Sequence, residues 1–344
     1  MPTLRIAVVG ASGYSGEELV RLVSRHPELQ LTAITSRSSA GRPVGSVIPG
    51  LPASLEKLTF ADIAPADLAG HADAFFLALP HGVAAEYAVP LRKAGKVVID
   101  LSADFRLKSP EIYKEFYGHD HPAPELLKES VYALPELHRD AIKKTDLIAC
   151  PGCYPTSILL ALAPALKNGL IDPASIVINS LSGVSGAGKK ADVSLLFAEL
   201  NESMKAYSVP KHRHLSEIEQ ELSLLAAQNV VVTFIPHLVP LTRGMITTIS
   251  AKVTRDLADK EVESLYAKYY TGEPFVMLKT DGTLPEVKRV VRSNLIEIAT
   301  RLDVRTGRLL LFSAIDNLGK GAAAQAVQAL NVRFGFEETM GLGA

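Results

Sequence analysis

The opening of the chain constrains its fold more than any other stretch. The continuous apolar run "LRIAVV" at 4–9 leads into the glycine-rich turn "GASGYSG" at 10–16, and the amphipathic segment "EELVRLVSRHP" follows at once. A short run that is apolar throughout is typical of a strand buried on both faces of a parallel sheet. Strand, tight turn and helix in this order predict the first unit of a Rossmann-type, doubly wound α/β sheet.

The glycines of this turn predict a dinucleotide site. Gly10, Gly13 and Gly16 have the spacing G-x-x-G-x-x-G, a variant of the dinucleotide fingerprint. Such glycines let backbone N–H groups approach a pyrophosphate at the start of a helix. A glycine-rich turn that binds nothing is the alternative, and the strand and helix around the turn favour binding. The predicted contacts are Gly10, Ser12, Gly13, Tyr14, Ser15 and Gly16.

The end of the next apolar run bears on which cofactor binds. An enzyme that uses NAD places an acidic residue near this point, to hold the ribose 2′-hydroxyl. Here "LQLTAIT" at 29–35 is followed by Ser36, Arg37 and Ser38. A guanidinium flanked by hydroxyl groups suits a 2′-phosphate, so the sequence predicts NADP. A solvated polar loop is the alternative interpretation.

Two further apolar runs continue the alternation of strands and helices. They are "ADAFFLAL" at 72–79 and "KVVIDLS" at 96–102, and the loops that follow them should lie at the carboxyl edge of the sheet, where ligands bind. In "LPHG" we predict cofactor contacts from Leu79 and Pro80, with His81 as a loop residue. In "SADFR" we predict that Arg106 binds an anion.

The second half of the chain has a different pattern. Six strands are predicted at 175–183, 229–241, 244–253, 275–280, 294–304 and 308–316, with helices at 214–228 and 256–272. The turn "RTG" between the last two strands favours a hairpin, and the pattern favours a largely antiparallel sheet in an α+β domain. We therefore predict an NADP-binding domain over 1–148, completed by a C-terminal helix at 317–344, and a catalytic and oligomerisation domain over 149–316.

Length, charge and cysteine content narrow the class of protein. The 344 residues suggest two domains, and a net charge of −1 gives no electrostatic attraction to nucleic acid or to an anionic membrane. The longest apolar run, "SILLALAPAL", is shorter than the roughly 20 residues that span a bilayer, and no signal peptide is visible. Two cysteines fit a reducing cytoplasm. We expect a cytoplasmic protein that acts on a small molecule.

Both cysteines lie in "ACPGCYPT" at 149–156. This stretch predicts a strand end, a Pro-Gly turn and the start of a helix. Cys153 falls at the helix start, where unpaired N–H groups and the helix dipole favour a nucleophilic thiolate, whereas Cys150 is predicted to pack at the strand end. The C-x-x-C spacing also fits a redox pair, although the surrounding chain lacks a thioredoxin-like context. A metal site would need further ligands that the sequence does not supply, so no metal is predicted.

A thiolate nucleophile needs an acid/base partner. "KHRHLSEIEQEL" places His212 and His214 on either side of Arg213, just before a helix. His237, within an apolar strand, is the weaker candidate. Spacing alone does not show which imidazole approaches the sulfur.

Several motifs in order along nearly the whole chain resemble the N-acetyl-gamma-glutamyl-phosphate reductases, a family of the semialdehyde dehydrogenase class in arginine biosynthesis. They are "GASGYSGEEL", "LPHG", "DLSADFRL", "YALPEL", "PGCYPT", "SGVSGAGKK", "HRHLSEIEQEL", "PHLVPLTRGM" and "DNLGKGAAAQAVQ". In "GKGAAAQA" the chain departs mildly from the family, which often has a glycine nearer the glutamine.

The resemblance implies a reaction and the residues that serve it. The reaction is NADPH-dependent reduction of N-acetyl-gamma-glutamyl phosphate to the 5-semialdehyde, with release of phosphate, through a thioester on Cys153. His212 is implied as the acid/base, and a homodimer or homotetramer as the assembly. Further cofactor contacts are implied at Ser182, Gly183, Gly186 and Asn317. Candidates for the substrate's phosphate and carboxylate are Arg106, Arg213 and His214, because guanidinium groups bind such anions bidentately.

Three other functions remain open at this point. A related reductase would act on aspartyl phosphate or on a carrier-bound aminoadipyl phosphate. A cysteine hydrolase would keep the dinucleotide site as a vestige. A non-catalytic protein would only sense NADP.

Overall fold

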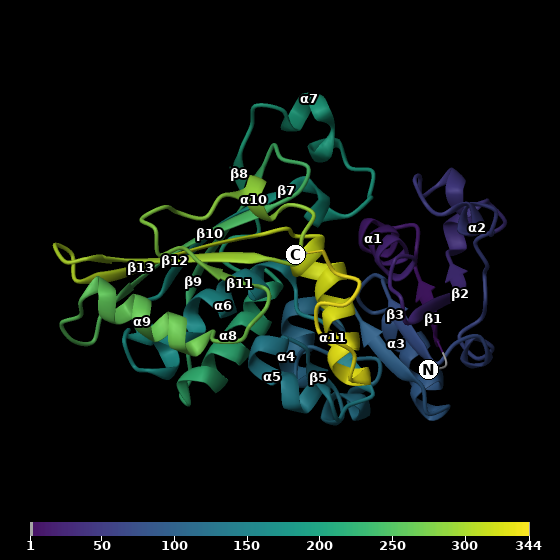
Figure 1. Ribbon diagram of the computed structural model, residues 1–344, viewed down its shortest axis with the longest axis horizontal. Coiled ribbons are helices and arrows are strands. Elements are labelled where there is room, and N and C mark those ends of the chain that lie inside the picture. Colours follow the sequence, from purple (N-terminus) through teal and green to yellow (C-terminus); the bar gives the residue numbers. More distant parts are fainter. Residues whose placement is uncertain (1–2, 344) are drawn as a thin grey trace. The chain divides into compact units, whose positions relative to one another are not determined.

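The computed structural model describes residues 3–343. The chain forms two compact units (Figure 1). One contains the chain up to Pro151 together with Ala322–Gly343, and the other contains Gly152–Gly321. The first unit is therefore built from two separate stretches of sequence.

The first unit contains a six-stranded sheet in the order β2-β1-β3-β4-β6-β5, and every neighbouring pair in it is parallel. This confirms the predicted Rossmann-type sheet. The strands are β1 (Leu4–Val9), β2 (Leu29–Thr35), β3 (Ala74–Leu77), β4 (Val97–Asp100), β5 (Val131–Tyr132) and β6 (Leu147–Ala149). The chain reverses its direction of strand addition after β2, so the carboxyl ends of β1 and β3 flank the position where such sheets bind ligands.

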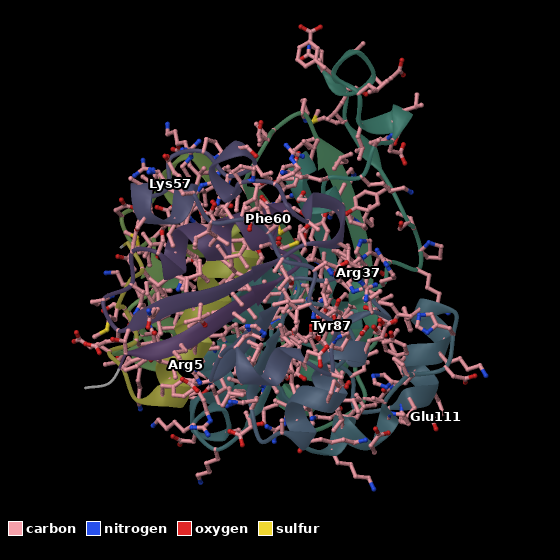
Figure 2. The ribbon with its side chains drawn as sticks, turned by 90° about the vertical axis from the view of Figure 1, so that its right-hand side faces the viewer. Arg5, Arg37, Lys57, Phe60, Tyr87 and Glu111 are labelled. Carbon is pink, nitrogen blue, oxygen red and sulfur yellow. The ribbon has the colours of Figure 1, made fainter. Side chains whose placement is uncertain are left out.

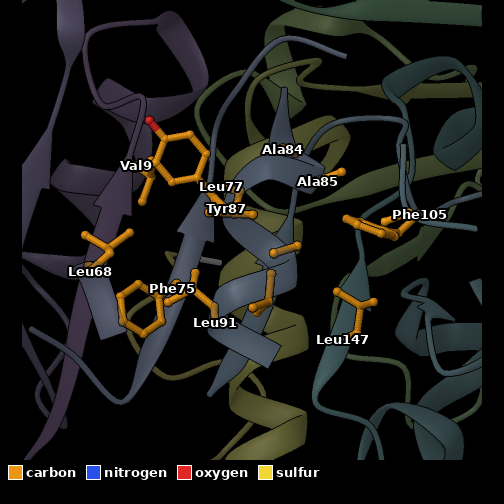
Figure 3. Close-up of a cluster of buried hydrophobic side chains, with 14 of the residues drawn as sticks. Val9, Leu68, Phe75, Leu77, Ala84, Ala85, Tyr87, Leu91, Phe105 and Leu147 are labelled. Carbon is orange, nitrogen blue, oxygen red and sulfur yellow. The ribbon is translucent and has the colours of Figure 1, made fainter. Parts of the chain in front are cut away.

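Helices and a buried apolar cluster support this sheet. The helices are α1 (Tyr14–Val23), α2 (Ala53–Glu56), α3 (Ala84–Lys93), α4 (Pro110–Tyr117), α5 (Pro135–Ile142) and α11 (Ala324–Phe334). Tyr87 and Leu91 of α3 pack with Phe75 and Leu77 of β3 in one cluster (Figure 3). Because β3 is buried on both faces, its sequence is apolar without alternation.

The last helix is shorter than the sequence pattern predicts. Its alanine-rich segment begins with a π-helical turn at Gly319–Ala323, and α11 then runs only to Phe334. Gly335 ends it in the left-handed conformation, with φ 73°. Within the first unit α11 contacts α1, α5 and β4. Residue 344, the end of the predicted segment, lies outside the described residues.

The second unit contains a seven-stranded mixed sheet in the order β11-β12-β13-β10-β7-β9-β8. Two neighbouring pairs, β11–β12 and β7–β9, are parallel, and the other four are antiparallel. The strands are β7 (Val177–Gly183), β8 (Lys205–Ala206), β9 (Thr233–Val239), β10 (Met245–Lys252), β11 (Val276–Leu278), β12 (Ile296–Asp303) and β13 (Arg308–Ile315). The largely antiparallel sheet and the hairpin of β12 and β13 agree with the sequence pattern.

One helix of the second unit is almost entirely buried. The helices are α6 (Cys153–Lys167), α7 (Phe197–Leu200), α8 (His214–Ala226), α9 (Asp259–Tyr269) and α10 (Val287–Val290), and Figure 1 shows α6, α8 and α9 on the same side of the sheet. Buried α6 carries Ser157, whose Oγ donates to Thr247 Oγ1 at 2.9 Å and lies 2.8 Å from Ser313 Oγ. Satisfied hydroxyl groups of this kind fix the position of a buried helix.

Candidate active site

Two glycines of the first turn are required by the protein's own packing. Gly10 has φ 81°, and a Cβ there would lie 2.4 Å from the carbonyl oxygen of Ala78 at the end of β3. A Cβ on Gly16 would lie 2.5 Å from the carbonyl oxygen of Gly10. The turn therefore needs glycine at both positions to connect β1 to α1 this tightly.

Gly13 differs, because nothing in the first unit crowds it. Its added Cβ would meet only the Gly10 carbonyl oxygen, at 3.8 Å. Gly13 is the N-cap of α1 and has no side chain to satisfy the first N–H groups of the helix. Open space before the N-terminus of a helix suits a pyrophosphate. Of the neighbouring predicted contacts, Tyr14 is exposed and Ser15 is half-buried.

The polar loop after β2 meets the glycine turn. Ser12 Oγ lies 2.7 Å from Ser36 Oγ, which lies 3.3 Å from Ser38 Oγ. The Arg37 guanidinium lies over the Tyr87 ring, 5.7 Å from its centroid, and 3.6 Å from the Glu86 carboxylate (Figure 2). The side chain of Arg37 remains 61% exposed, so it is held beside the loop and open to an anion.

The loops after β3 and β4 are joined through a buried carboxylate. Asp104 accepts the N–H of Gly82 at 2.7 Å and the hydroxyl of Tyr113 at 3.0 Å. His81 Nδ1 accepts the N–H of Ala103 at 3.0 Å, so its ring orders the loop. Of the predicted cofactor contacts here, Leu79 is half-buried and Pro80 is exposed.

Arg106 is more buried than its predicted role as an anion ligand suggests. Only 4% of it is exposed, and it donates Nε to the Cys150 carbonyl at 2.7 Å and Nη2 to the Leu101 carbonyl at 2.9 Å. Its charge lies near Asp100, whose pKa is raised to about 7 by burial and then by Asp104. These donors connect the ends of β4 and β6. Binding of a substrate anion by Arg106 stays a prediction.

The two thiols lie in different environments. Cys150 is 1% exposed, and burial, with a smaller effect from Asp100, raises the pKa of its thiol well above the ordinary range. Cys153 is half-buried and is the first residue of α6. A Cβ on Gly321 would lie 2.8 Å from Cys153 Cβ, so the lack of a side chain at Gly321 leaves room for Cys153.

The histidines of "HRH" form one cluster with aromatic rings. His212 and His214 have ring centroids 5.0 Å apart, and the ring of Tyr154 lies 5.4 Å from His212 and 5.8 Å from His214. The backbone N–H of His214 donates to His212 Nδ1 at 3.1 Å. Burial, and then the charge of Arg213, lowers the pKa of His212 to about 4. His212 is therefore neutral near pH 7 and carries its proton on Nε2.

Two tyrosines border the thiol. Tyr207 donates its hydroxyl to that of Tyr154 at 3.0 Å, and Tyr154 donates to the His237 carbonyl at 3.4 Å. Burial is the main cause that raises the pKa of Tyr207 to about 12, and a Cys153 thiolate would raise it further. Both hydroxyl groups stay protonated near neutral pH. His237, the weaker histidine candidate, therefore contacts this pair of tyrosines through its backbone carbonyl.

Three of the four contacts implied by the resemblance lie together. A Cβ on Gly186 would lie 3.3 Å from Ser182 Oγ and 3.6 Å from Asn317 Nδ2. Asn317 accepts the Gly244 N–H at 2.7 Å. Gly183 lies beside them at the end of β7, where a Cβ would lie 2.8 Å from the Leu241 carbonyl oxygen.

Sequence reasoning missed three residues of this site. Tyr207 lies outside the strands and helices that the sequence predicts, and Gly321 falls within the predicted C-terminal helix at 317–344. Glu217, buried in the first turn of α8, accepts the Gly152 N–H at 3.2 Å. A charged residue on the apolar face of the predicted helix was the signal that could have identified it. Over residues 3–343, the structure shows no group of three His, Cys, Asp or Glu side chains suited to a metal ion.

Known protein families match both units. The semialdehyde dehydrogenase NAD binding domain matches residues 5–145, and the semialdehyde dehydrogenase dimerisation domain matches residues 153–317. N-acetyl-gamma-glutamyl-phosphate reductase of Moorella thermoacetica is 49% identical over 98% of each chain, and that of Geobacter metallireducens is 50% identical over 98% of each chain. The chain belongs to the N-acetyl-gamma-glutamyl-phosphate reductase family. A member of this family is an oxidoreductase of the semialdehyde dehydrogenase class.

Solved structures share the fold of this reductase family member at low sequence identity. Aspartate semialdehyde dehydrogenase II of Vibrio cholerae, complexed with ASA, has a TM-score of 0.74 and 17% identity, covering 96% of this chain and 98% of that one. The Candida albicans aspartate semialdehyde dehydrogenase with NADP has a TM-score of 0.73 and 16% identity, with the same coverage. In the part of the chain that the structure describes, no helix is long and apolar enough to cross a membrane.

Proposed function

We propose that this protein reduces N-acetyl-gamma-glutamyl phosphate to N-acetyl-L-glutamate 5-semialdehyde with NADPH, releasing phosphate, as a step of arginine biosynthesis. The observation that carries the proposal is the placement of Cys153 as the first residue of α6, in a chain about half identical to reductases of that name. The ring of the next residue, Tyr154, lies 5.4 Å from the ring of neutral His212. A cytoplasmic location is part of the same proposal.

Cys153 is the nucleophile. Its sulfur attacks the acyl carbon, the bond from that carbon to the phosphate oxygen breaks, and phosphate leaves with the bonding electrons, so that a thioester remains. NADPH, when bound, supplies the hydride. Once the thioester carbon is reduced, the C–S bond of the hemithioacetal breaks, which regenerates the thiolate and releases the aldehyde. A thioester is reduced more readily than a carboxylate, because sulfur donates little electron density to the carbonyl.

His212 serves as a hydrogen-bond donor in this scheme. Because Nδ1 accepts the His214 N–H, the neutral ring presents Nε2–H. That group can stabilise a thiolate or the oxyanion of a tetrahedral intermediate by donating a hydrogen bond. Tyr154 and Tyr207 flank the ring and, being protonated, add no charge near the sulfur.

Several groups of the first unit are suited to bind NADPH. The open N-cap at Gly13 suits the pyrophosphate, and Ser36, Arg37 and Ser38 suit a 2′-phosphate. The predicted contacts of Ser182, Gly183, Gly186 and Asn317 belong to the same proposal. For the acidic groups of the substrate we retain Arg213, which is exposed at the start of α8, and His214 and Arg106.

A homodimer or homotetramer belongs to the proposal. Burial alternates along β10 and β13: one face carries buried Met245 and Leu311, and the other leaves Ile246, Leu310 and Phe312 half-exposed. A sheet face with partly exposed apolar side chains, in a segment that matches a dimerisation domain, supports self-association through this sheet.

A reverse assay tests the proposed reaction. The purified protein, N-acetylglutamate 5-semialdehyde, phosphate and NADP should produce NADPH, and the rate should fall to background without phosphate. Aspartate semialdehyde and a carrier-bound aminoadipate semialdehyde serve as competing substrates, and a clear preference for either would overturn the assignment. Phosphate-dependent oxidation excludes a hydrolase, and turnover excludes a protein that only senses NADP.

A further inference from the structure

Asp316 is a fully buried carboxylate that the proposed reaction leaves without a role. It follows β13 directly and is 0% exposed. Its Oδ1 accepts Nε of Arg243 at 3.2 Å and the Leu318 N–H at 2.9 Å. Its Oδ2 lies 2.7 Å from Nη2 of Arg243 and accepts the Arg292 N–H at 2.6 Å. A carboxylate is costly to bury unless hydrogen bonds and an opposite charge compensate it, and Asp316 has both.

The partners of Asp316 come from three different turns of the second unit. Arg243 lies between β9 and β10, Arg292 lies between α10 and β12, and Leu318 follows β13. Arg292 has φ 67°, a conformation that few residues with a side chain adopt, and in it the Arg292 N–H donates to Asp316. The carboxylate therefore joins three turns that are far apart in sequence.

The turn after β13 carries two residues of the candidate site. Asn317, an implied cofactor contact, donates its Nδ2 to Ser185 Oγ at 2.9 Å. The Asp316 carbonyl oxygen accepts the Gly321 N–H at 2.9 Å. A Cβ on Gly321 would lie 2.8 Å from Cys153 Cβ. Asp316 thus anchors, at its two ends, the segment that runs from Asn317 to the residue packed against Cys153.

The geometry requires a carboxylate at this position. Each oxygen of Asp316 accepts one backbone N–H, from Leu318 or from Arg292. An Asn side chain in either orientation would point its NH2 group at one of these donors, because an amide has only one acceptor oxygen. Arg243 supplies the opposite charge and a planar fork that bonds both oxygens.

We propose that Asp316, held by Arg243, is a positioning residue that sets the spacing between Asn317 and Cys153 and thereby the rate of hydride transfer. This inference rests on the proposed function for the reaction and for the cofactor contact of Asn317. Asp316 touches neither substrate nor cofactor in this scheme. It acts through the turn that it anchors, and a displacement of about 1 Å between reacting groups can slow a reaction by about 100-fold.

The test is a single turnover of the reverse reaction, without phosphate. Cys153 adds to the aldehyde carbon of N-acetylglutamate 5-semialdehyde, and the resulting hemithioacetal gives its hydride to NADP and its hydroxyl proton to solvent. The thioester then stays on the sulfur, because no phosphate is present to release it. NADPH therefore appears as a burst, stoichiometric with active thiols, whose rate reports hydride transfer. Deuterium at the aldehyde carbon should slow this burst.

The rate and the amplitude of the burst separate positioning from a merely structural role. In Asp316→Asn the rate should fall by about 10- to 100-fold, while the amplitude per iodoacetamide-reactive thiol stays unchanged. The matched control is Glu297→Gln, because Glu297 is a carboxylate of β12, 2% exposed, that accepts the Glu286 N–H at 3.0 Å. Its burst rate should stay within about twofold. An unchanged rate in Asp316→Asn, a lower amplitude at unchanged rate, or an equal fall in the control would overturn the inference.

Arg243→Lys decides the matter if Asp316→Asn fails to fold. Lysine keeps the charge but not the two-pronged contact, so the burst rate should fall by about three- to tenfold, and an unchanged rate contradicts the proposal.

Alkylation of Cys153 separates this inference from the proposed function. Saturating NADP should slow the reaction of Cys153 with iodoacetamide by about tenfold in the unaltered protein and by less than about threefold in Asp316→Asn. Equal slowing in the two proteins rejects the positioning role. If the unaltered protein gives no burst, the reductase reaction is rejected, and the alkylation rates alone decide whether Asp316 sets the spacing between cofactor and thiol.

Discussion

The backbone N–H of His214 donates to Nδ1 of His212 at 3.1 Å, and this single bond fixes which nitrogen of the neutral His212 ring carries the proton. Because the pKa of His212 is lowered to about 4, the ring stays neutral, with Nε2–H as its donor, through the physiological range. A neutral donor of this kind can be imitated by an amide.

His212→Gln should therefore retain more activity than His212→Ala. The Gln amide nitrogen reaches about as far as Nε2 and supplies an N–H without a base. We expect kcat/KM to fall by roughly 10- to 100-fold in His212→Gln and by a further tenfold or more in His212→Ala, in line with loss of one oxyanion donor. Steady-state kinetics of the reverse reaction measure both. Equal losses in the two variants would indicate that His212 acts as a base.

Replacement of the two cysteines should have opposite consequences. Cys153→Ser should abolish turnover and leave NADPH affinity within about twofold, because the thiol is the proposed nucleophile and the proposed pyrophosphate site lies in the first unit. Cys150→Ser should keep activity and lower the free energy of unfolding by about 1–3 kcal/mol, since it places a more polar hydroxyl group in a buried position. Turnover assays, fluorescence titration with NADPH and urea denaturation test both. Loss of activity in both variants would favour a paired-thiol mechanism.

The glycines of the first turn should separate cofactor binding from folding. Gly13→Ala introduces a Cβ with only one neighbour, at 3.8 Å, so the melting temperature of the apoprotein should stay within a few degrees while NADPH affinity falls about tenfold or more. Gly16→Ala should lower the melting temperature, because its Cβ would lie 2.5 Å from the Gly10 carbonyl oxygen. Calorimetry and NADPH titration of both variants distinguish the two effects. Unchanged affinity in Gly13→Ala would place the pyrophosphate elsewhere.

Arg37 should determine the choice between NADPH and NADH. Arg37→Ala removes the guanidinium that lies over Tyr87 and should raise KM for NADP by about tenfold, with little change for NAD. The matched control is Glu86→Gln, which removes the ion pair with Arg37 and keeps the guanidinium. The affinity of Glu86→Gln for NADP should stay the same or increase. An equal loss for both cofactors in Arg37→Ala would argue against a 2′-phosphate contact.

Asp100 should make the stability of the protein depend on pH. Its pKa is raised from 3.8 to about 7, so the folded state binds more protons than the unfolded state between about pH 4 and 7. Its contribution to stability is therefore present at low pH and is lost as the pH rises toward 7. Asp100→Asn cannot ionise, so its free energy of unfolding relative to the unaltered protein should improve from pH 5 to pH 8.

Asp73 provides the control of opposite sign. It is partly exposed, and a hydrogen bond from Arg5 is the largest cause that lowers its pKa, so its contribution is present above the unfolded pKa and is lost as the pH falls. Asp73→Asn should change the pH dependence of the free energy of unfolding little, and only in the acid range. Urea denaturation at each pH measures the free energy of unfolding of the unaltered protein, Asp100→Asn and Asp73→Asn. An identical pH dependence in Asp100→Asn and the unaltered protein would contradict the predicted titration.

Local sequence determined the elements and several site positions. The apolar run at 4–9, the glycines that follow it and the helix after them fix a strand, a tight turn and a helix, because each depends on residues close in sequence. The same holds for Cys153 at the start of α6, since a Pro-Gly turn and a long apolar segment mark the start of that helix. The polar loop at Ser36–Ser38 could likewise be predicted from its position after a strand.

Only the tertiary structure decided how distant residues meet. The pairing of Glu217 with Gly152, the contact of Gly321 with Cys153 and the hydroxyl bond between Tyr207 and Tyr154 each join residues at least 50 positions apart. The burial of Arg106 against the carbonyls of Cys150 and Leu101 is of the same kind. Side-chain packing and burial set these contacts and the resulting shifts in pKa, and no local pattern encodes them, because they depend on which strands and helices become neighbours in the folded chain.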